Sequence, residues 1–78
     1  MSASYTTEEV RYLKQIGNRI RELRVESGLL QEKLSFGCNL DRTYLGSVER
    51  GERNISVINL RKIANTLKYK VADLLNSL

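Results

Sequence analysis

Arg42, Thr43 and Ser47 lie in a short segment whose side chains could read the edges of nucleic-acid bases. The guanidinium group of Arg42 presents two donors in a fork, which matches the O6 and N7 acceptors of guanine. Thr43 offers a methyl group to a thymine methyl and a hydroxyl to a base edge or a phosphate. Asp41 is a strong helix N-cap, so these residues would begin a helix, with Ser47 one turn later on the same exposed face. In isolation, this pattern is also typical of a solvated surface.

The sequence has few of the residues that usually carry out catalysis or bind metals. The chain has no histidine, which removes the commonest general base and the usual partner of a nucleophilic serine or cysteine. The adjacent Glu8 and Glu9 would point about 100° apart on a helix, so they do not form a carboxylate pair. Cys38 is the only cysteine, which excludes an intrachain disulfide. We therefore expect no enzyme, no catalytic residue, no metal site and no cofactor.

The size and charge of the chain are those of a small basic domain. It has 78 residues, a net charge of +4 and an isoelectric point near 9.5, which is compatible with a polyanionic partner but does not identify one. A core of this size supplies only a few kcal/mol, so without a disulfide or a metal we expect oligomerisation. The sequence shows no signal peptide, and no apolar run approaches the roughly 18 residues that a membrane span needs. A lone cysteine fits a reducing compartment. We expect a cytoplasmic protein with no membrane partner.

Apolar residues recur at spacings of three and four between glycines and short polar clusters, which predicts an all-α fold with five helices. Gly28 is expected to stop the first helix and Gly37 the second, while Asn39 can adopt the left-handed conformation that the following turn needs. We expect one domain over residues 1–78, with residues 1–5 disordered. The expected helices lie at about residues 6–28, 31–36, 41–50, 56–67 and 71–77.

Two short helices joined by a tight turn at about residues 31–50 have the layout of a helix-turn-helix. The segments GLLQEKL (28–34) and LDRTYLGSVERGERN (40–54) resemble the XRE-type family of lambdoid phage repressors and Cro proteins. Within that family they are most similar in appearance to controller proteins of restriction-modification systems. The resemblance implies a compact, lambda-repressor-like domain that binds double-stranded DNA. It places base-contacting residues at Arg42, Thr43 and Ser47.

The resemblance also implies residues that contact the DNA backbone and residues that hold the motif together. Arg24 and Glu49 match an arginine and a glutamate that pair in the family, so we expect a structural ion pair between them. Leu30 departs from the family pattern, because a Ser or Thr normally caps the second helix there, and the helix is weakened by about 1 kcal/mol. For Tyr44, packing on the domain and a contact to the DNA backbone remain equal alternatives. The residues expected at the DNA backbone are Gln31, Tyr44, Arg50, Arg53 and Asn54.

A homodimer is the expected assembly. Val71, Leu74, Leu75 and Leu78 would form its interface, and the dimer would bind two half-sites about 34–36 Å apart. No residues remain for a sensing domain, so no small-molecule ligand is expected and regulation would follow the concentration of the protein itself. This suits a controller that binds its own promoter, with RNA polymerase as a further partner if it activates.

Three alternatives are left open by the sequence. A phage Cro-like repressor or an antitoxin would show the same helices, and genomic neighbours would separate them from a controller. A protein-interaction module that has lost DNA binding should lack the arginine at the start of the third helix and the basic flank, and both are present here. A monomeric DNA-binding protein would be recognised by sedimentation.

Overall fold

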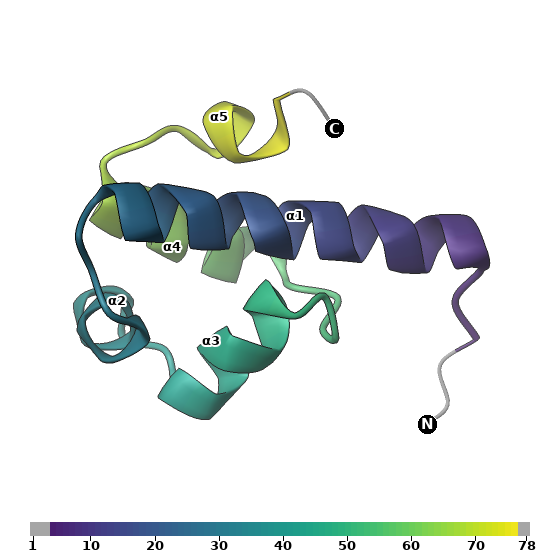
Figure 1. The fold of residues 1–78 in the computed structure, drawn as a ribbon, viewed down its shortest axis with the longest axis horizontal. Coiled ribbons are helices and arrows are strands. Elements are labelled where there is room, and N and C mark those ends of the chain that lie inside the picture. The colour runs from purple at the N-terminus through teal and green to yellow at the C-terminus, as the bar shows by residue number, and fades with distance from the viewer. Residues whose placement is uncertain (1–3, 77–78) are drawn as a thin grey trace.

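The computed structural model describes residues 4–76, and these residues form five α-helices and no strand, as the sequence predicts. Helix α1 crosses the molecule, α5 lies along one side of it, and α2 and α3 lie on the other (Figure 1). Both α3 and α5 pack on α1, while α4 packs on α2 and α5. The helices are α1 (Thr7–Glu26), α2 (Gln31–Cys38), α3 (Arg42–Glu49), α4 (Val57–Leu67) and α5 (Val71–Leu75).

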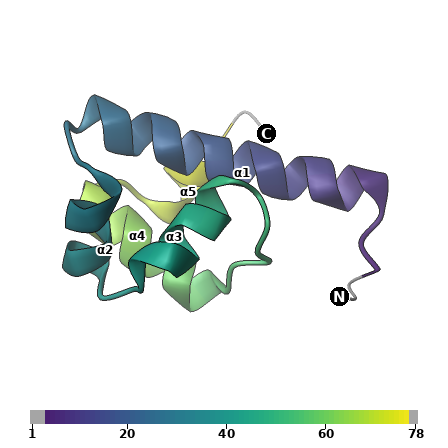
Figure 2. The ribbon, with the colours of Figure 1, turned by 60° about the horizontal axis from the view of Figure 1, so that its bottom comes forward.

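Helix α1 begins with a capping box and carries one buried stripe. The Thr6 hydroxyl accepts from the Glu9 amide at 3.0 Å, and the Thr6 amide donates to the Glu9 carboxylate at 2.9 Å. The helix ends next to Gly28, whose φ of +73° favours glycine and confirms the predicted stop. Ile16, Ile20 and Leu23 are buried in the core. The N-terminal half of α1 extends past the other helices (Figure 2).

Gly17 allows α1 to pack closely against the end of α3. A Cβ atom at this position would overlap the Val48 carbonyl oxygen and would lie 2.7 Å from the Glu49 carbonyl oxygen. Both obstacles are backbone atoms of a helix, so they can move only if the helix moves. The absence of a side chain at residue 17 therefore fixes how near the end of α3 lies to α1.

Substituting Gly17 with alanine should lower the free energy of unfolding by about 3 kcal/mol, because the two helices must separate. Gly37→Ala is the matched control: its Cβ would lie 2.7 Å from the Thr66 methyl group, which is part of a rotatable side chain. The control should cost less, because the Thr66 side chain can rotate away whereas the backbone carbonyls beside Gly17 cannot. The gain of about 1 kcal/mol in helix propensity is common to both variants. Urea unfolding followed by circular dichroism measures both. Equal stability of Gly17→Ala and the parent would contradict the close packing.

The end of α2 differs from the prediction. Gly37 does not stop the helix, which continues to Cys38 and ends at Asn39 with a left-handed φ of 57°. The physical reason is tertiary: residue 37 faces Thr66 of α4, and the small residue permits close packing of the two helices. The conformation predicted for Asn39 is confirmed. Leu30 makes no side-chain cap at the start of α2, in line with the missing cap inferred from the sequence.

The C-terminal helices complete the core, and one prediction about them is wrong. Leu74 has no exposed surface and belongs to the core, so it cannot form the predicted dimer interface. Val71 and Leu75 are partly buried against the same core. Leu78 lies outside the described residues. Residues 1–3, which belong to the segment 1–5 expected to be disordered, also lie outside them. The α4 residues of the core are Leu60, Ile63, Ala64 and Leu67.

Cys38 is a buried core residue, and burial raises the pKa of its thiol. The thiol is therefore protonated at neutral pH, as expected for a structural cysteine. Within residues 4–76, no group of three or more potential ligands is arranged to hold a metal ion. None of the helices in this range is long and apolar enough to cross a membrane.

Candidate nucleic-acid interface

The first turn of α3 is the accessible part of that helix. The Asp41 carboxylate accepts from the Tyr44 amide at 3.2 Å, which caps the helix as the sequence predicts. Arg42 and Thr43 follow it and are exposed. From Leu45 onward every residue of α3 is buried, so the helix is anchored at its far end. The arrangement presents an arginine and a threonine at the N-terminal end of a helix whose C-terminal end is packed in the core.

Arg42 shares a shallow hollow with the start of α2. The hollow is also lined by Leu30, Gln31 and Glu32, so the leading ends of α2 and α3 meet at one surface. Among the described residues, no hydrogen bond or salt bridge involves the Arg42 guanidinium group. Its donors are therefore available to an external acceptor.

A buried polar cluster connects the three elements that hold α3. The Arg24 Nε lies 2.7 Å from Glu49 Oε2 and its Nη2 lies 3.0 Å from Oε1, which makes a two-pronged ion pair. The same guanidinium donates through Nη1 to the Leu29 carbonyl oxygen at 2.7 Å. Gln31 Nε2 completes the cluster by donating to Glu49 Oε1 at 2.9 Å. The cluster thus joins α1, the start of α2 and the end of α3.

Gln31 is held by this cluster in a way that the sequence did not reveal. One amide hydrogen is used by Glu49, while the side chain is only partly buried beside the backbone of Gly46. The amide is therefore fixed at the surface of α2 with its remaining hydrogen-bonding capacity available. The sequence does not predict this hydrogen bond, because Gln31 and Glu49 are 18 residues apart and neither residue type indicates the other as its partner.

Ser47 is not on the exposed face that the sequence predicts. It is 6% exposed, and its hydroxyl donates to the Tyr44 carbonyl oxygen at 2.6 Å while accepting from Arg53 Nε at 3.2 Å. The prediction of exposure is wrong because the chain after α3 folds back over this position. In this arrangement the hydroxyl is not available to a base edge.

Tyr44 packs on the domain, which was one of the two alternatives for it. Its hydroxyl accepts from Asn59 Nδ2 of α4 at 3.2 Å, and the Arg53 guanidinium lies 5.5 Å from the centre of its ring. Asn59 is a residue that the sequence analysis missed. It lies 15 residues from its partner, so helical periodicity carries no information about the contact.

Arg50 forms an exposed ion pair rather than a free cation. Its Nε lies 3.1 Å and its Nη2 3.2 Å from the two carboxylate oxygens of Glu52. The hydrogen bond from Arg50, more than its charge, lowers the pKa of Glu52 from its ordinary value, while the same contact raises the pKa of Arg50. A phosphate that binds Arg50 must therefore compete with Glu52.

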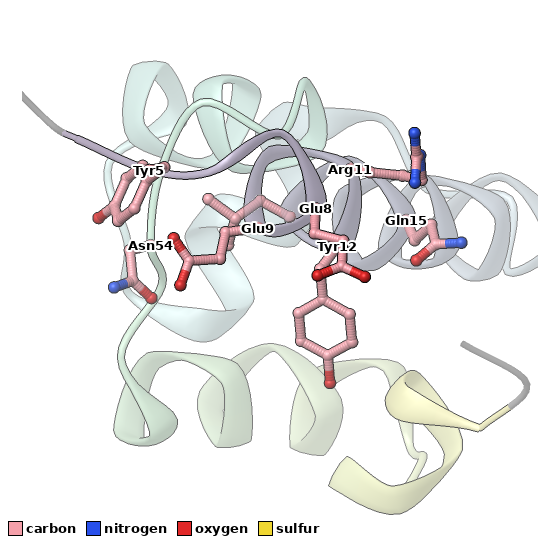
Figure 3. A pocket seen from close by; sticks show the side chains of 8 residues that line it. Tyr5, Glu8, Glu9, Arg11, Tyr12, Gln15 and Asn54 are labelled. Carbon is pink, nitrogen blue, oxygen red and sulfur yellow. The ribbon is translucent and has the colours of Figure 1, made fainter.

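Asn54 is exposed and lies beside the N-terminal end of α1. It lines a hollow at the N-terminal end of α1 together with Tyr5, Glu9 and Tyr12, as Figure 3 shows. The lining carries two carboxylates, from Glu8 and Glu9, against one cation, Arg11, so the hollow itself is unfavourable for a phosphate. The Asn54 amide can therefore serve a polyanion only from the rim of the hollow.

Comparison with known proteins identifies relatives for this fold and surface. The helix-turn-helix family HTH_3 matches residues 20–74. Control protein C.BamHI from Bacillus amyloliquefaciens is 42% identical over 71 residues, which cover 90% of this chain and 85% of that protein. Control protein C.MunI from a Mycoplasma species is 40% identical over 63 residues, which cover 80% of this chain and 85% of that protein.

A solved structure extends the match to three dimensions. The restriction-modification controller protein C.AhdI from Aeromonas hydrophila superposes with a TM-score of 0.78 and 48% sequence identity, covering 80% of this chain and 94% of that one. The family match over residues 20–74 includes the capped helix α3 and the turn before it. The chain belongs to the helix-turn-helix family that includes the control proteins of restriction-modification systems.

Proposed function

We propose that the chain is a sequence-specific, double-stranded DNA-binding regulator of transcription that acts as the controller of a restriction-modification system. The observation that carries the proposal is the exposed first turn of α3, with Arg42 and Thr43 at the tip of a helix whose far end is buried. A helix presented in this way enters the major groove with its N-terminal residues at the base edges. The proposed role is binding, without a catalytic step or a cofactor.

The proposed contacts divide into two groups. Arg42 and Thr43 read bases, because they are the exposed side chains of the leading turn. Gln31 and Arg53 bind phosphates on either side, because each is fixed by a neighbour and remains at the surface. Phosphate contacts position the protein without reading the sequence. Contacts of Tyr44, Arg50 and Asn54 with the DNA backbone remain predictions, because Tyr44 is bonded to Asn59, Arg50 is paired with Glu52, and Asn54 lies at an acidic hollow.

The proposed assembly is a homodimer whose interface includes the start of α4. Val57 and Ile58 are adjacent there and are 74% and 61% exposed, while the predicted interface residue Leu74 is buried. Two adjacent exposed aliphatic side chains on a small domain are a suitable contact for a second copy of the chain. A two-fold dimer would place two copies of α3 in successive major grooves.

Ile58→Glu is expected to abolish the dimer, because it places a charge in an apolar contact. Sedimentation at micromolar concentration should give a mass near 8.9 kDa for this variant and about twice that for the parent. Val25→Glu is the control, since it makes a similar change at a 55% exposed position on α1. A parent protein that remains monomeric, or an Ile58→Glu variant that remains dimeric, would show that this interface is wrong.

Binding to the promoter of its own gene is proposed from the resemblance to controller proteins, and a concentration-dependent dimer suits that role. DNA occupancy by a dimer rises steeply with protein concentration, so the protein could time the expression of its neighbours. If it activates, RNA polymerase is the further partner. DNA as the target places this activity in the cytoplasm, at the nucleoid.

Selection of bound duplexes from a random pool tests the proposed function. The expected result is a two-fold symmetric site with half-sites about one helical turn apart. Affinity for that site should fall steeply with salt, because phosphate contacts release counterions. Failure to enrich any sequence, with no salt-dependent binding to duplex DNA, would contradict the proposal.

A further inference from the structure

Ser47 and Arg53 form a contact that no base-reading role explains. The orientation of the Ser47 hydroxyl is fixed by its own helix, because it donates to the Tyr44 carbonyl oxygen one turn earlier at 2.6 Å. Its oxygen then accepts from Arg53 Nε at 3.2 Å. A buried residue of α3 thereby holds an exposed arginine that belongs to the following loop.

A second contact fixes the plane of the same guanidinium group. Arg53 lies over the Tyr44 ring at 5.5 Å, and the far end of that ring is hydrogen-bonded to Asn59 of α4. The arginine is thus held at its Nε edge by Ser47 and across its face by Tyr44. An arginine held at two points loses less conformational freedom on binding than a free one.

We propose that Ser47 is a positioning residue, which orients Arg53 for a DNA phosphate without touching DNA itself. The inference deepens the proposed function and rests on it. With Nε engaged by Ser47, the outward edge of the guanidinium group carries its two Nη groups. Among residues 4–76, no hydrogen bond or salt bridge involves either of them. Two parallel N–H donors on a fixed plane match two oxygens of one phosphate.

Ser47→Ala tests the inference in the parent and in an Arg53→Ala background. In the parent, the substitution should weaken operator binding about threefold to tenfold, which is the size expected for loss of one ordinary hydrogen bond that positions Arg53 without touching DNA. The slope of log affinity against log salt should also become shallower by up to about 1.8, the value for one phosphate contact in each subunit of the dimer. In the Arg53→Ala background, Ser47→Ala should have no further effect on either quantity.

Ser35→Ala is a closely matched control. Ser35 is 8% exposed in α2, and its hydroxyl donates to the Glu32 carbonyl oxygen three residues earlier at 2.9 Å, but it holds no arginine. Both serine variants should lose similar thermal stability, and only Ser47→Ala should change the salt slope. The nitrogen-15 spectrum of Arg53 gives a second measurement on the free protein: its Nε–H should exchange slowly in the parent and rapidly in Ser47→Ala.

Three results would overturn the inference while leaving the proposed function intact. The first is an unchanged salt slope in Ser47→Ala, and the second is an equal loss of affinity in the Arg53→Ala background. The third is tighter binding by Ser47→Ala, which would mean that Ser47 restrains Arg53 from reaching DNA. Absence of any duplex binding by the parent would instead overturn both.

Discussion

Glu49→Ala should lower the free energy of unfolding by about 3–5 kcal/mol, because it leaves the Arg24 guanidinium group buried without its counter-charge. The Arg24 and Glu49 side chains are only 9% and 2% exposed, and two of the hydrogen bonds of Arg24 end on Glu49. Domains of this kind are stable by about 5–15 kcal/mol, so the loss is a large part of the total. Urea unfolding at neutral pH measures it.

Two further variants distinguish the effect of breaking the buried Arg24–Glu49 ion pair from the effect of removing any carboxylate. Glu52→Ala removes a carboxylate from an exposed arginine pair and should leave the unfolding midpoint nearly unchanged. Arg24→Met combined with Glu49→Leu removes both buried charges and should recover most of the lost stability. Near-parental stability of Glu49→Ala alone would show that solvent reaches Arg24 and that the buried pair does not hold α3.

The double variant also connects stability with binding. Even when stable, it lacks the Glu49 oxygen to which Gln31 donates. The Gln31 amide is then free to move at the start of α2, so affinity for DNA should remain below that of the parent. Recovery of full affinity would remove Gln31 from the proposed phosphate contacts.

Local signals were sufficient to predict the helices. Thr6, Asp41 and Ser56 each cap a helix as their types predict, since the capping hydrogen bond involves residues only three positions apart. Gly37 shows where such rules fail. Glycine often ends a helix, but here close packing on Thr66 favours it inside one. The competing contact comes from a residue 29 positions later, which no local pattern contains.

Burial of individual side chains was harder to predict than the helices themselves. An apolar stripe near the C-terminus fits a core or a dimer interface equally well, and only the packing of α5 on α1 places Leu74 in the core. Ser47 lies one helical turn after Thr43, so periodicity alone puts both on one face. The return of the chain at Arg53 covers Ser47 and leaves Thr43 exposed.

Arg42→Ala should remove the discrimination of one base pair in each half-site of the operator. A bidentate contact between arginine and guanine contributes about 1–3 kcal/mol, so a symmetric dimer would lose about 2–6 kcal/mol, or roughly 30-fold to 10⁴-fold in affinity. Arg42 is exposed, so the thermal stability of the protein should not change. Fluorescence anisotropy with the selected operator and its single-base variants measures the loss.

Arg42→Lys distinguishes the shape of the side chain from its charge. Lysine keeps the positive charge but lacks the planar fork, so the variant should lose most of the base preference and keep the salt slope. Arg21→Ala removes an exposed arginine from α1 and should leave the base preference unchanged. Arg53→Ala should weaken binding to all sequences about equally and reduce the salt slope by about one phosphate contact in each subunit.

The four arginine variants together decide whether the first turn of α3 reads bases. If Arg42→Ala and Arg42→Lys both retain the parental preference among the single-base variants, Arg42 binds the backbone or nothing. Movement of the helix would not explain that outcome, because the far end of α3 is anchored by Leu45 and Val48, which are almost completely buried. Specificity would then have to come from Thr43 or from the shape of the DNA, because Arg42 and Thr43 are the exposed side chains of the first turn of α3 and Tyr44 is half-buried.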